Sequence, residues 1–261
     1  MRILHYTLGL PPLRCGGLTK YTSDLMSAQC ANGDVVSLLY PGDLTFWKIP
    51  NVKIIETGKY NGVTIYEIKN PTIVTLQNGV RKPSDIFRPK KRLSIHLLEK
   101  FFIETKPDVF HIHTFMGLPQ ELVAYLKEKG TKIVFTSHDY YGICLRTNFI
   151  NQDSISCDSP GGMQCALCNK NAPGSLFLRL RNSNYLLKHK ALLSSKSTQK
   201  KVRETVLNPN EVDLKQEQIE EYITLIDYYK NLFELIDCFY FNSSVSQDVY
   251  KNHIKIKQSV I

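Results

Sequence analysis

The sequence predicts an α/β domain with a mainly parallel, doubly wound sheet. Short apolar runs typical of buried strands alternate with amphipathic helical segments, which is the pattern of repeated βα units. The chain has 261 residues, of which 43% are hydrophobic and 10% aromatic, enough for one large packed domain. Glycine and polar residues directly follow several expected strands, where open parallel sheets bind their ligands.

The first βα unit opens the chain. Residues 2–6 form the expected strand, and a loop that ends in Gly16-Gly17 leads into an amphipathic helix. We expect the buried face of this helix to carry Leu18, Tyr21, Leu25 and Ala28. A strand, a glycine pair and a helix place backbone N–H groups where they can face an anion. Many such turns need glycine only for their backbone geometry, so both interpretations stay open.

The middle of the chain continues the alternation. Asn61-Gly62 is a hairpin signal between two short strands. In chain order we expect a strand at 34–40, paired strands at 52–57 and 63–68, a helix at 93–104, a strand at 108–113, a helix at 119–129 and a strand at 132–137.

The last part of the chain is less regular. A polar insertion with glycines and cysteines occupies 147–172, helical character returns at 175–190, and a second polar stretch covers 194–210. A long helix is expected over 214–236, with these residues buried: Ile219, Ile223, Ile226, Phe233 and Ile236. A strand is expected at 238–241, followed by Asn242-Ser243 and a short helix.

Polar residues follow the ends of several expected parallel strands. The carboxyl ends of such strands lie at the same edge of a sheet, and ligands bind beyond that edge. We therefore expect one rim to gather Gly16, Gly17, His113, His138, Asp139, Asn242 and Ser243. This convergence is the main indication of a functional site.

Four stretches carry a family resemblance: Gly16-Gly17-Leu18 with its helix, PDVFHIHTFMGLP, KIVFTSHDYYGICLR and YFNSS. In this order and spacing they resemble the N-terminal, acceptor-side domain of glycosyltransferase family 4 enzymes of the GT-B fold. The resemblance implies one Rossmann-like GT-B domain over 1–257, with 147–172 as an insertion. It also implies that 258–261 begin the connection to a donor-binding domain that this chain lacks.

The resemblance implies a function as well. The chain is expected to be the acceptor-binding half of a retaining glycosyltransferase. Such an enzyme moves a sugar from a nucleotide-sugar to a cell-surface polysaccharide or a lipid-linked glycan, without a catalytic metal. The missing domain would hold most of the nucleotide-sugar, because the paired glutamates that bind the donor in this family cannot be placed here. We therefore expect the chain alone to be inactive or nearly so.

The expected catalytic residues are His113, His138 and Asp139. His111 and His113 share one face of a strand, being two residues apart. His113, at the strand end, is better placed to meet a sugar or polyol hydroxyl, whereas His111 is expected to be a satisfied core histidine. A neutral His138 imidazole can hydrogen-bond sugar hydroxyls, and Asp139 either orients a neighbouring group or caps the next turn.

The expected contacts to the nucleotide-sugar are Gly16, Gly17, Asn242 and Ser243. The family uses the glycine loop to let the donor diphosphate approach the helix N-terminus. We find no clear carboxylate nucleophile in this chain and assign none.

The cysteines form the sharpest local pattern. Seven cysteines without a secretory signal do not indicate a simple disulfide framework. Cys165 and Cys168 are separated by two residues, a spacing that lets one turn aim two sulfurs at one ion, and Cys144 and Cys157 complete a tetrahedral set. A structural zinc site is predicted, with free thiols or one disulfide as the alternatives. The remaining cysteines are expected to be small packed residues: Cys15, Cys30 and Cys238.

The net charge of +9 is unevenly distributed. Residues 173–203 contain basic side chains and no acid, and 81–106 form a second basic segment. This favours a polyanionic partner, such as an anionic membrane surface, although a solvated basic face is the simpler alternative. The segments 88–102 and 176–190 combine apolar and basic residues, as interfacial helices do. No nucleic-acid-binding module is recognisable, so a nucleic-acid partner is not expected.

Localisation follows from the apolar runs. None approaches the roughly 18 residues needed to span a bilayer, and Pro11-Pro12 interrupts the first one. We expect a cytoplasmic protein, with the option of peripheral binding to the inner face of the cell membrane. Two other classes stay open: a non-catalytic module that binds glycan or lipid phosphate with a partner subunit, and a zinc-stabilised nucleic-acid-binding protein.

Overall fold

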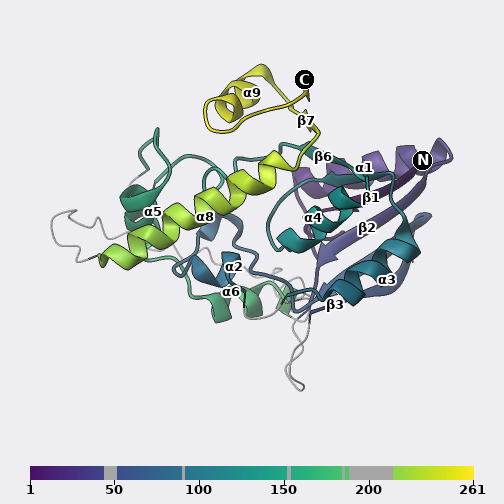
Figure 1. Ribbon diagram of the computed structural model, residues 1–261, viewed down its shortest axis with the longest axis horizontal. Coiled ribbons are helices and arrows are strands. Elements are labelled where there is room, and N and C mark those ends of the chain that lie inside the picture. The colour runs from purple at the N-terminus through teal and green to yellow at the C-terminus, as the bar shows by residue number, and fades with distance from the viewer. Residues whose placement is uncertain (44–51, 90–91, 152–153, 184–185, 188–213) are drawn as a thin grey trace, which may run out of the picture.

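The computed structural model describes residues 1–43, 52–89, 92–151, 154–183, 186–187 and 214–261. They form one eight-stranded sheet with helices on both faces (Figure 1). The strands are β1 (Arg2–Tyr6), β2 (Val35–Pro41), β3 (Lys53–Tyr60), β4 (Val63–Lys69), β5 (Val109–Ile112), β6 (Lys132–Thr136), β7 (Cys238–Tyr240) and β8 (Ser259–Val260). The helices are α1 (Gly17–Ala31), α2 (Ser84–Phe87), α3 (Ile95–Thr105), α4 (Gln120–Glu128), α5 (Gly162–Asn169), α6 (Ser175–Arg181), α8 (Gln216–Glu234) and α9 (Ser244–Lys251), with a 3₁₀ turn η1 (Leu76–Asn78).

The strand order confirms the expected doubly wound α/β class. The order is β3-β4-β2-β1-β5-β6-β7-β8, and every pair is parallel except the β3–β4 hairpin. The chain moves outward from β1 to the hairpin, returns to the other side of β1 as β5, and then moves outward again. The direction of winding therefore changes between β1 and β5. In open α/β sheets this switch point is where ligands bind.

Strand register brings three histidine-bearing segments together at the switch point. His5 on β1 pairs with His111 on β5, which pairs with Val134 on β6. Directly after β5, the His113 N–H donates to the Tyr6 carbonyl at 2.9 Å. The segments that follow β1, β5 and β6 consequently lie at one edge.

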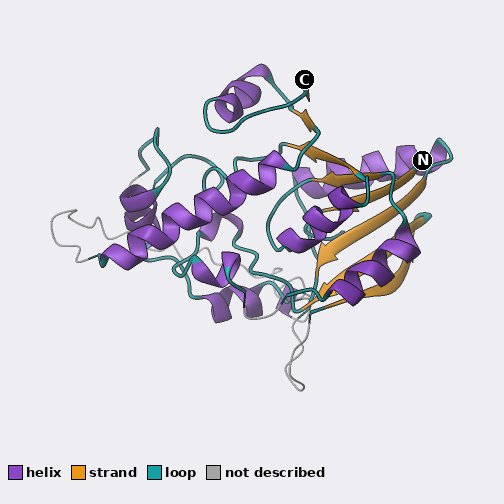
Figure 2. Cartoon of the chain, in the orientation of Figure 1, coloured by secondary structure: helices purple, strands orange, loops and turns teal. Residues whose placement is uncertain are grey.

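The two faces of the sheet carry different cores. Side chains alternate along a strand, so Leu4 and Tyr6 point into the large core, whereas His5 faces α1. The α1 face has a smaller core of Met26, Val36, Leu38, Val63 and Ile65. Figure 2 shows the strands gathered on one side of the molecule, with α5, α6 and α8 on the other.

Helix α1 turns a different face to the sheet from the one expected. Its buried residues are Thr19, Thr22 and Met26. The expected face is wrong, because Tyr21 is 44% exposed and Leu18, Leu25 and Ala28 are also not buried. Burial of Thr22 leaves no unpaired hydroxyl group, because Thr22 Oγ1 donates to the Leu18 carbonyl at 2.8 Å within the helix.

The long helix α8 lies where it was expected, and one of its predicted core residues is wrong. Ile219, Ile226, Phe233 and Ile236 are buried, but Ile223 is 45% exposed. Tyr222 occupies the buried stripe instead. Its hydroxyl donates to the Val80 carbonyl at 2.8 Å, so a polar aromatic residue can be buried there without an unpaired group.

The insertion at 147–172 contains a helix that the sequence pattern did not predict. Helix α5 packs against α8, and an isolated bridge joins Ile150 to Ser156. The helix predicted at 175–190 is present as α6 up to Arg181, and residues 186–187 are again helical. Residues 184–185 and 188–190 and the polar stretch 194–210 lie outside the described residues. Within the described part of the chain, we find no helix with the length and apolarity that crossing a membrane requires.

Candidate functional site

Three histidines and one glutamine form a chain of contacts at the switch point. His138 Nε2 lies 3.1 Å from His113 Nδ1. On the other side of the same ring, His113 Nε2 lies 3.0 Å from His5 Nδ1. The chain ends on α1, where His5 Nε2 lies 2.7 Å from Gln29 Oε1. The sequence predicted His113 and His138 as site residues and missed His5 and Gln29.

Burial keeps these imidazoles neutral. His5 and His113 are 0% and 2% exposed, and His138 is half-buried. Burial lowers the pKa of His5 to about 4, although its hydrogen bond with Gln29 acts in the opposite direction. It also lowers the pKa of His138 to about 4 and that of His113 well below its usual range. At neutral pH each ring therefore has one N–H donor and one lone-pair acceptor.

The geometry changes the role expected for His113. Both of its ring nitrogens are occupied by other histidines, and its side chain is buried. His113 is therefore a link in this structure, and His138 is the histidine that lines an open space. His111 fits its expected place in the core, because it is buried and its Nε2 lies 2.7 Å from Thr136 Oγ1.

The ring nitrogens of His5, His111 and His113 are close enough together for one metal ion, but the rings are not oriented to bind it. One nitrogen from each ring lies within 4.8 Å of the others. The rings of His111 and His113 are stacked, with centroids 4.2 Å apart and planes 28° apart. Imidazole binds an ion through an in-plane lone pair. Stacked rings direct these lone pairs along nearly parallel planes, so the arrangement fits hydrogen bonds better than one shared ion.

A hollow of about 480 Å³ adjoins His138. Its wall combines apolar side chains with hydrogen-bonding groups, the usual composition of a small-molecule site. The lining residues are Leu8, Leu18, Leu76, Gln77, Asn78, Met116, His138, Asp139, Thr147 and Arg181. They come from segments that follow β1, β5 and β6, together with α1, η1 and α6.

The N-terminus of α1 adjoins this hollow through Leu18. Gly16 is the N-cap residue, with φ of 129°, and supplies no side chain to cap the helix. A side chain at Gly16 or Gly17 would meet no neighbouring atom, and both residues are exposed. Gly16 is thus required for its backbone conformation, and the first-turn N–H groups have no side-chain cap.

Two arginines lie close together beside the hollow. Arg181 Nη1 donates to Asn78 Oδ1 at 2.9 Å, and Arg14 Nη2 donates to Asn182 Oδ1 at the same distance. Burial and then the neighbouring Arg181 lower the pKa of Arg14. Among the described residues, neither guanidinium forms an ion pair with a carboxylate. In the described part of the chain, these two cations therefore lie beside the hollow without a carboxylate at ion-pair distance.

Asp139 has a local structural role in addition to lining the hollow. Its Oδ1 accepts a hydrogen bond from the Tyr141 N–H at 2.9 Å, and its carbonyl accepts one from the Tyr250 hydroxyl at 2.7 Å. Burial raises the pKa of this carboxyl group, while the Tyr141 N–H lowers it. The bond from the Tyr141 N–H to Asp139 Oδ1 is the turn-capping role, which the sequence offered as the alternative to a functional role.

Asn242 and Ser243 lie at the same edge of the sheet but do not line the hollow. Ser243 is the N-cap of α9, where its Oγ accepts from the Ser246 N–H at 3.2 Å. Ser246 Oγ lies 3.0 Å from Ser137 Oγ, which connects α9 to the segment after β6. In this structure Ser243 caps α9, and the expected contact of Asn242 and Ser243 with a donor stays a prediction.

The four cysteines predicted to bind zinc come from three parts of the insertion region. Cys144 precedes the insertion, Cys157 follows the bridge, and Cys165 and Cys168 lie on α5. Burial, with added contributions from the other three thiols, raises the pKa of Cys165 to about 12. Among the described residues, the group of ligand atoms within 4.8 Å is the histidine trio, not these sulfurs. The zinc site stays a prediction.

The three remaining cysteines differ in how far they are buried. Cys238 is buried, as expected, and Cys30 is partly buried. Cys15 is exposed, so its predicted packed position is wrong. It lies in the loop before α1, where its Sγ is 3.6 Å from the Pro12 carbonyl oxygen.

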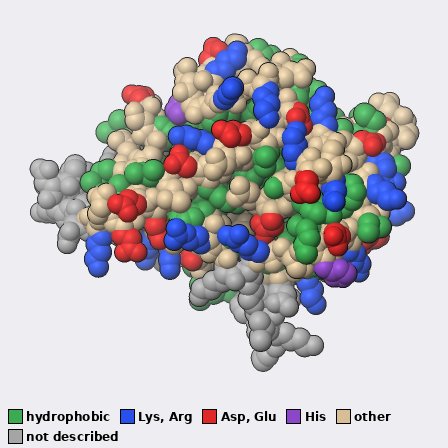
Figure 3. Space-filling view, in the orientation of Figure 1, with side chains coloured by type: hydrophobic (Ala, Val, Ile, Leu, Met, Phe, Trp, Pro, Cys, Tyr) green, Lys and Arg blue, Asp and Glu red, His purple; other side chains and the backbone are tan. Residues whose placement is uncertain are grey.

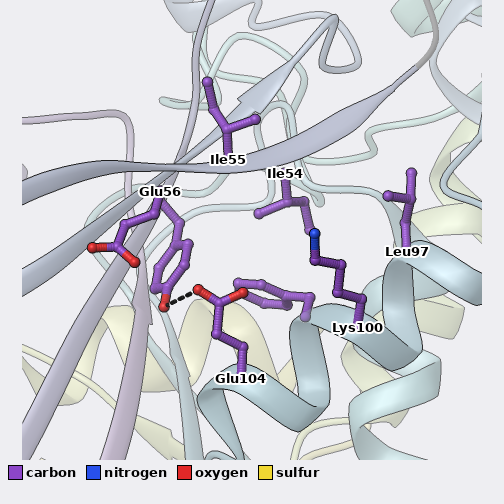
Figure 4. Close-up of a pocket in the computed structure, with 8 residues that line it drawn as sticks. Ile54, Ile55, Glu56, Leu97, Lys100 and Glu104 are labelled. Atoms are coloured by element: carbon purple, nitrogen blue, oxygen red, sulfur yellow. Dashed lines mark hydrogen bonds between the residues drawn. The ribbon is translucent and has the colours of Figure 1, made fainter.

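A second hollow lies at the other end of the sheet. It is about 320 Å³ in volume and is enclosed by β3, β4 and α3 (Figure 4). The Tyr66 hydroxyl donates to Glu104 Oε1 at 2.9 Å across it, and Lys100 and Glu56 also line it.

On the face seen in Figure 3, Lys and Arg side chains are interspersed with Asp and Glu.

Comparisons with known proteins give only weak likenesses to solved structures. No protein-family model matches the sequence, and no curated protein matches it. Among solved structures, a sucrose-phosphate synthase from Thermosynechococcus elongatus is 13% identical over 99% of this chain, with a TM-score of 0.41. A trehalose 6-phosphate synthase from Burkholderia multivorans is 13% identical over 97%, with a TM-score of 0.39. The starch synthase IV catalytic domain from Arabidopsis thaliana is 17% identical over 52%, with a TM-score of 0.30.

The chain spans less than half of each of these structures: 46%, 42% and 34% of their lengths, in the same order. At these identities and TM-scores the matches do not assign a function.

Proposed function

We propose that this chain is the acceptor-binding half of a retaining glycosyltransferase, which moves a sugar from a nucleotide-sugar to a cell-surface polysaccharide or lipid-linked glycan. The observation that carries the proposal is the hollow at the switch-point edge. There a neutral imidazole, two side-chain amides and an uncapped helix N-terminus meet beside two arginines. The sequence resemblance to the acceptor-side domain of this family supports the same conclusion.

The composition of the hollow suits a sugar ring. Sugars present hydroxyl groups that donate and accept, along with apolar C–H faces. His138, Gln77 and Asn78 offer groups that match the hydroxyls. Leu8 and Met116 offer apolar surface for the C–H faces. A neutral His138 is suited to this role because it binds a hydroxyl without an extra charge.

The positive charge beside the hollow suits a phosphate group. Leu18 in the first turn of α1 and Arg181 both line the hollow, and Arg14 lies near Arg181. A helix N-terminus and arginines stabilise anions together. The phosphate would belong to the donor diphosphate or to a lipid-linked acceptor. In a retaining transfer of this kind, such groups stabilise the departing diphosphate.

The same hollow suits a related alternative. A glycan-binding or lipid-phosphate-binding module that works with a separate donor subunit would need the same imidazole, amides and cations. Discovery of a donor-binding domain in the same polypeptide after residue 261, with two glutamates seven residues apart, would favour the enzyme. No feature of the described residues favours the nucleic-acid-binding alternative.

Docking to an anionic membrane remains part of the proposal for lipid-linked acceptors. Leu176 and Phe177 on α6 are exposed, as interfacial docking requires. The basic residues of α6 are less available, because Arg179 donates to the Pro71 carbonyl at 3.1 Å and Arg181 to Asn78. Any membrane contact at α6 would therefore depend mainly on the apolar pair.

Binding of defined sugars tests the proposal. Methyl glycosides of glucose, galactose and mannose, glucose 1-phosphate, UDP and GDP are titrated into ¹⁵N-labelled protein. We expect shifts at the His138 imidazole and at the side-chain amides of Gln77 and Asn78. His138→Ala should weaken sugar binding by about 2- to 10-fold, the contribution of roughly one hydrogen bond. His253→Ala, a matched histidine on the turn after α9, should leave the affinity unchanged.

Two results would contradict the proposal. One is that none of these sugars or phosphates shifts the resonances of the hollow. The other is that the shifts appear instead around Tyr66 and Glu104 in the second hollow, with Glu104→Gln weakening binding and His138→Ala having no effect.

A further inference from the structure

The contacts between His138, His113, His5 and Gln29 are arranged in a line. Every ring in the line uses one nitrogen toward each neighbour, and the three contacts measure 3.1, 3.0 and 2.7 Å. The line begins at the hollow with His138 and ends at Gln29 on α1. The planes of the His5 and His113 rings differ by 14°, and their centroids are 5.3 Å apart. With His5 Nδ1 and His113 Nε2 only 3.0 Å apart, the two nitrogens lie close to the line between the centroids, as an in-plane N–H···N hydrogen bond requires.

Neutral imidazoles make such a line directional. Each ring has one N–H and one lone pair, so a ring that accepts at one nitrogen must donate at the other. Once the group at either end is fixed as donor or acceptor, every proton in the line is fixed as well. The rings are neutral because burial opposes their protonation.

Gln29 fixes the direction. Its Oε1 faces His5 Nε2 and can only accept, so the proton of His5 is on Nε2 and its Nδ1 accepts. His113 must then donate from Nε2 and accept at Nδ1, and His138 must donate from Nε2. The remaining atom, His138 Nδ1, has a lone pair. A rotated Gln29 amide would present an N–H instead and reverse every proton in the line.

We propose that Gln29, His5 and His113 are positioning residues that hold His138 as its Nε2–H tautomer, leaving the Nδ1 lone pair to accept a hydrogen bond from a ligand hydroxyl. The part that concerns the ligand hydroxyl rests on the proposed function, whereas the tautomer assignment rests on the hydrogen bonds between neutral, buried rings. Tyr21 supports the arrangement, since its ring packs edge-on against His113 and His138 at 5.9 and 5.0 Å between centroids.

Long-range ¹H–¹⁵N correlation spectra of the imidazole rings test the tautomers in the unmodified protein at pH 7. They report which nitrogen of each ring carries the proton. We expect the proton on Nε2 in His5, His113 and His138 alike. A proton on Nδ1 of His5 or His138 would overturn the proposal. So would a protein that binds Zn²⁺, added as zinc chloride, through lone pairs at both His5 Nδ1 and His113 Nε2.

Substitutions at position 29 test the coupling. Gln29→Glu supplies only an acceptor, so the proton of His138 should stay on Nε2. Gln29→Lys supplies only donors, so His5, His113 and His138 should all move their protons to Nδ1. Gln29→Met supplies neither a donor nor an acceptor and should leave His138 as a mixture of both tautomers. This variant keeps the test decisive if the lysine variant does not fold.

Two histidines outside the line are the matched controls. His111 bonds to Thr136, and His253 Nδ1 lies 2.9 Å from the Val249 carbonyl. Their tautomers should be the same in all position-29 variants. An unchanged His138 tautomer across Gln29→Glu, Gln29→Lys and Gln29→Met would overturn the proposal. If the tautomers follow position 29 but no sugar binds, the proposed function fails and this inference stands; if sugars bind but the tautomers do not follow, the reverse holds.

Discussion

His5 Nδ1 lies 3.0 Å from His113 Nε2, so one hydrogen bond joins β1 to the segment after β5 across the switch point of the sheet. Both side chains are buried, and the bond is connected through Gln29 to α1 and through His138 to the hollow. The geometry that shapes the candidate site therefore also contributes to holding the sheet and α1 together.

Stability should fall as the pH is lowered from 6.5 toward 4. In the folded protein the pKa of His5 is lowered to about 4, whereas an unfolded histidine titrates near 6.5. Between these values the unfolded chain binds more protons, so the free energy of unfolding decreases with decreasing pH. The loss for His5 is on the order of 3 kcal/mol and is complete below the folded pKa. Urea unfolding at several pH values measures it.

The neutral variant His5→Gln should make this pH dependence shallower. His253→Gln, which changes a histidine outside the cluster, is the matched control and should keep the dependence of the unmodified protein. An equally steep dependence in His5→Gln would show that His5 is not the source of the acid sensitivity.

The two glycines before α1 should respond differently to alanine. Gly16 has φ of 129° and ψ of 176°, a region that residues with a Cβ rarely enter, so Gly16→Ala should cost about 1–3 kcal/mol. Gly17 is the first helical residue and has open space around it, so Gly17→Ala should be neutral or stabilise by less than about 1 kcal/mol. Thermal unfolding compares the two. Equal losses of stability would argue against a purely conformational requirement at Gly16.

Asp139 should matter to stability through its turn-capping bond. Asp139→Ala removes the acceptor for the Tyr141 N–H and should cost about 1 kcal/mol. Asp139→Asn keeps an acceptor oxygen at the same place and should cost much less. If both variants unfold alike but Asp139→Asn loses sugar binding, the carboxylate has a binding role beyond the turn.

The purified protein should contain one equivalent of zinc held by Cys144, Cys157, Cys165 and Cys168. A dication would favour the thiolate at Cys165, which burial otherwise disfavours. Elemental analysis measures the metal, and Cys165→Ser or Cys168→Ser should abolish it. Cys238→Ser removes a buried thiol from β7 and should keep it. A metal-free protein with four reactive thiols after unfolding would support the free-thiol alternative instead.

Local pattern was sufficient for the order of elements. Alternating apolar runs and helical stripes predicted the strands from β1 to β7 and the helices α1, α3, α4, α8 and α9, because strand and helix periodicities are properties of short segments. The same signals were poorer guides to burial. On α1 the threonines are buried and Tyr21 is not, because packing against the sheet decides which side of a weakly amphipathic helix faces inward.

In the candidate site, too, some residues could be predicted from the sequence and others could not. His113, His138 and Asp139 could be identified from the sequence because each follows a strand-like run. His5 and Gln29 lie within a strand and a helix, where they resemble ordinary core and surface residues. The sequence by itself determined the α/β class and the polar residues that end its strands. Only the tertiary structure decided that His5, His113, His138 and Gln29 share one line of hydrogen bonds. The physical reason is that such contacts depend on which strands are neighbours, in what register, and how a helix is rotated above them, and no single segment contains that information.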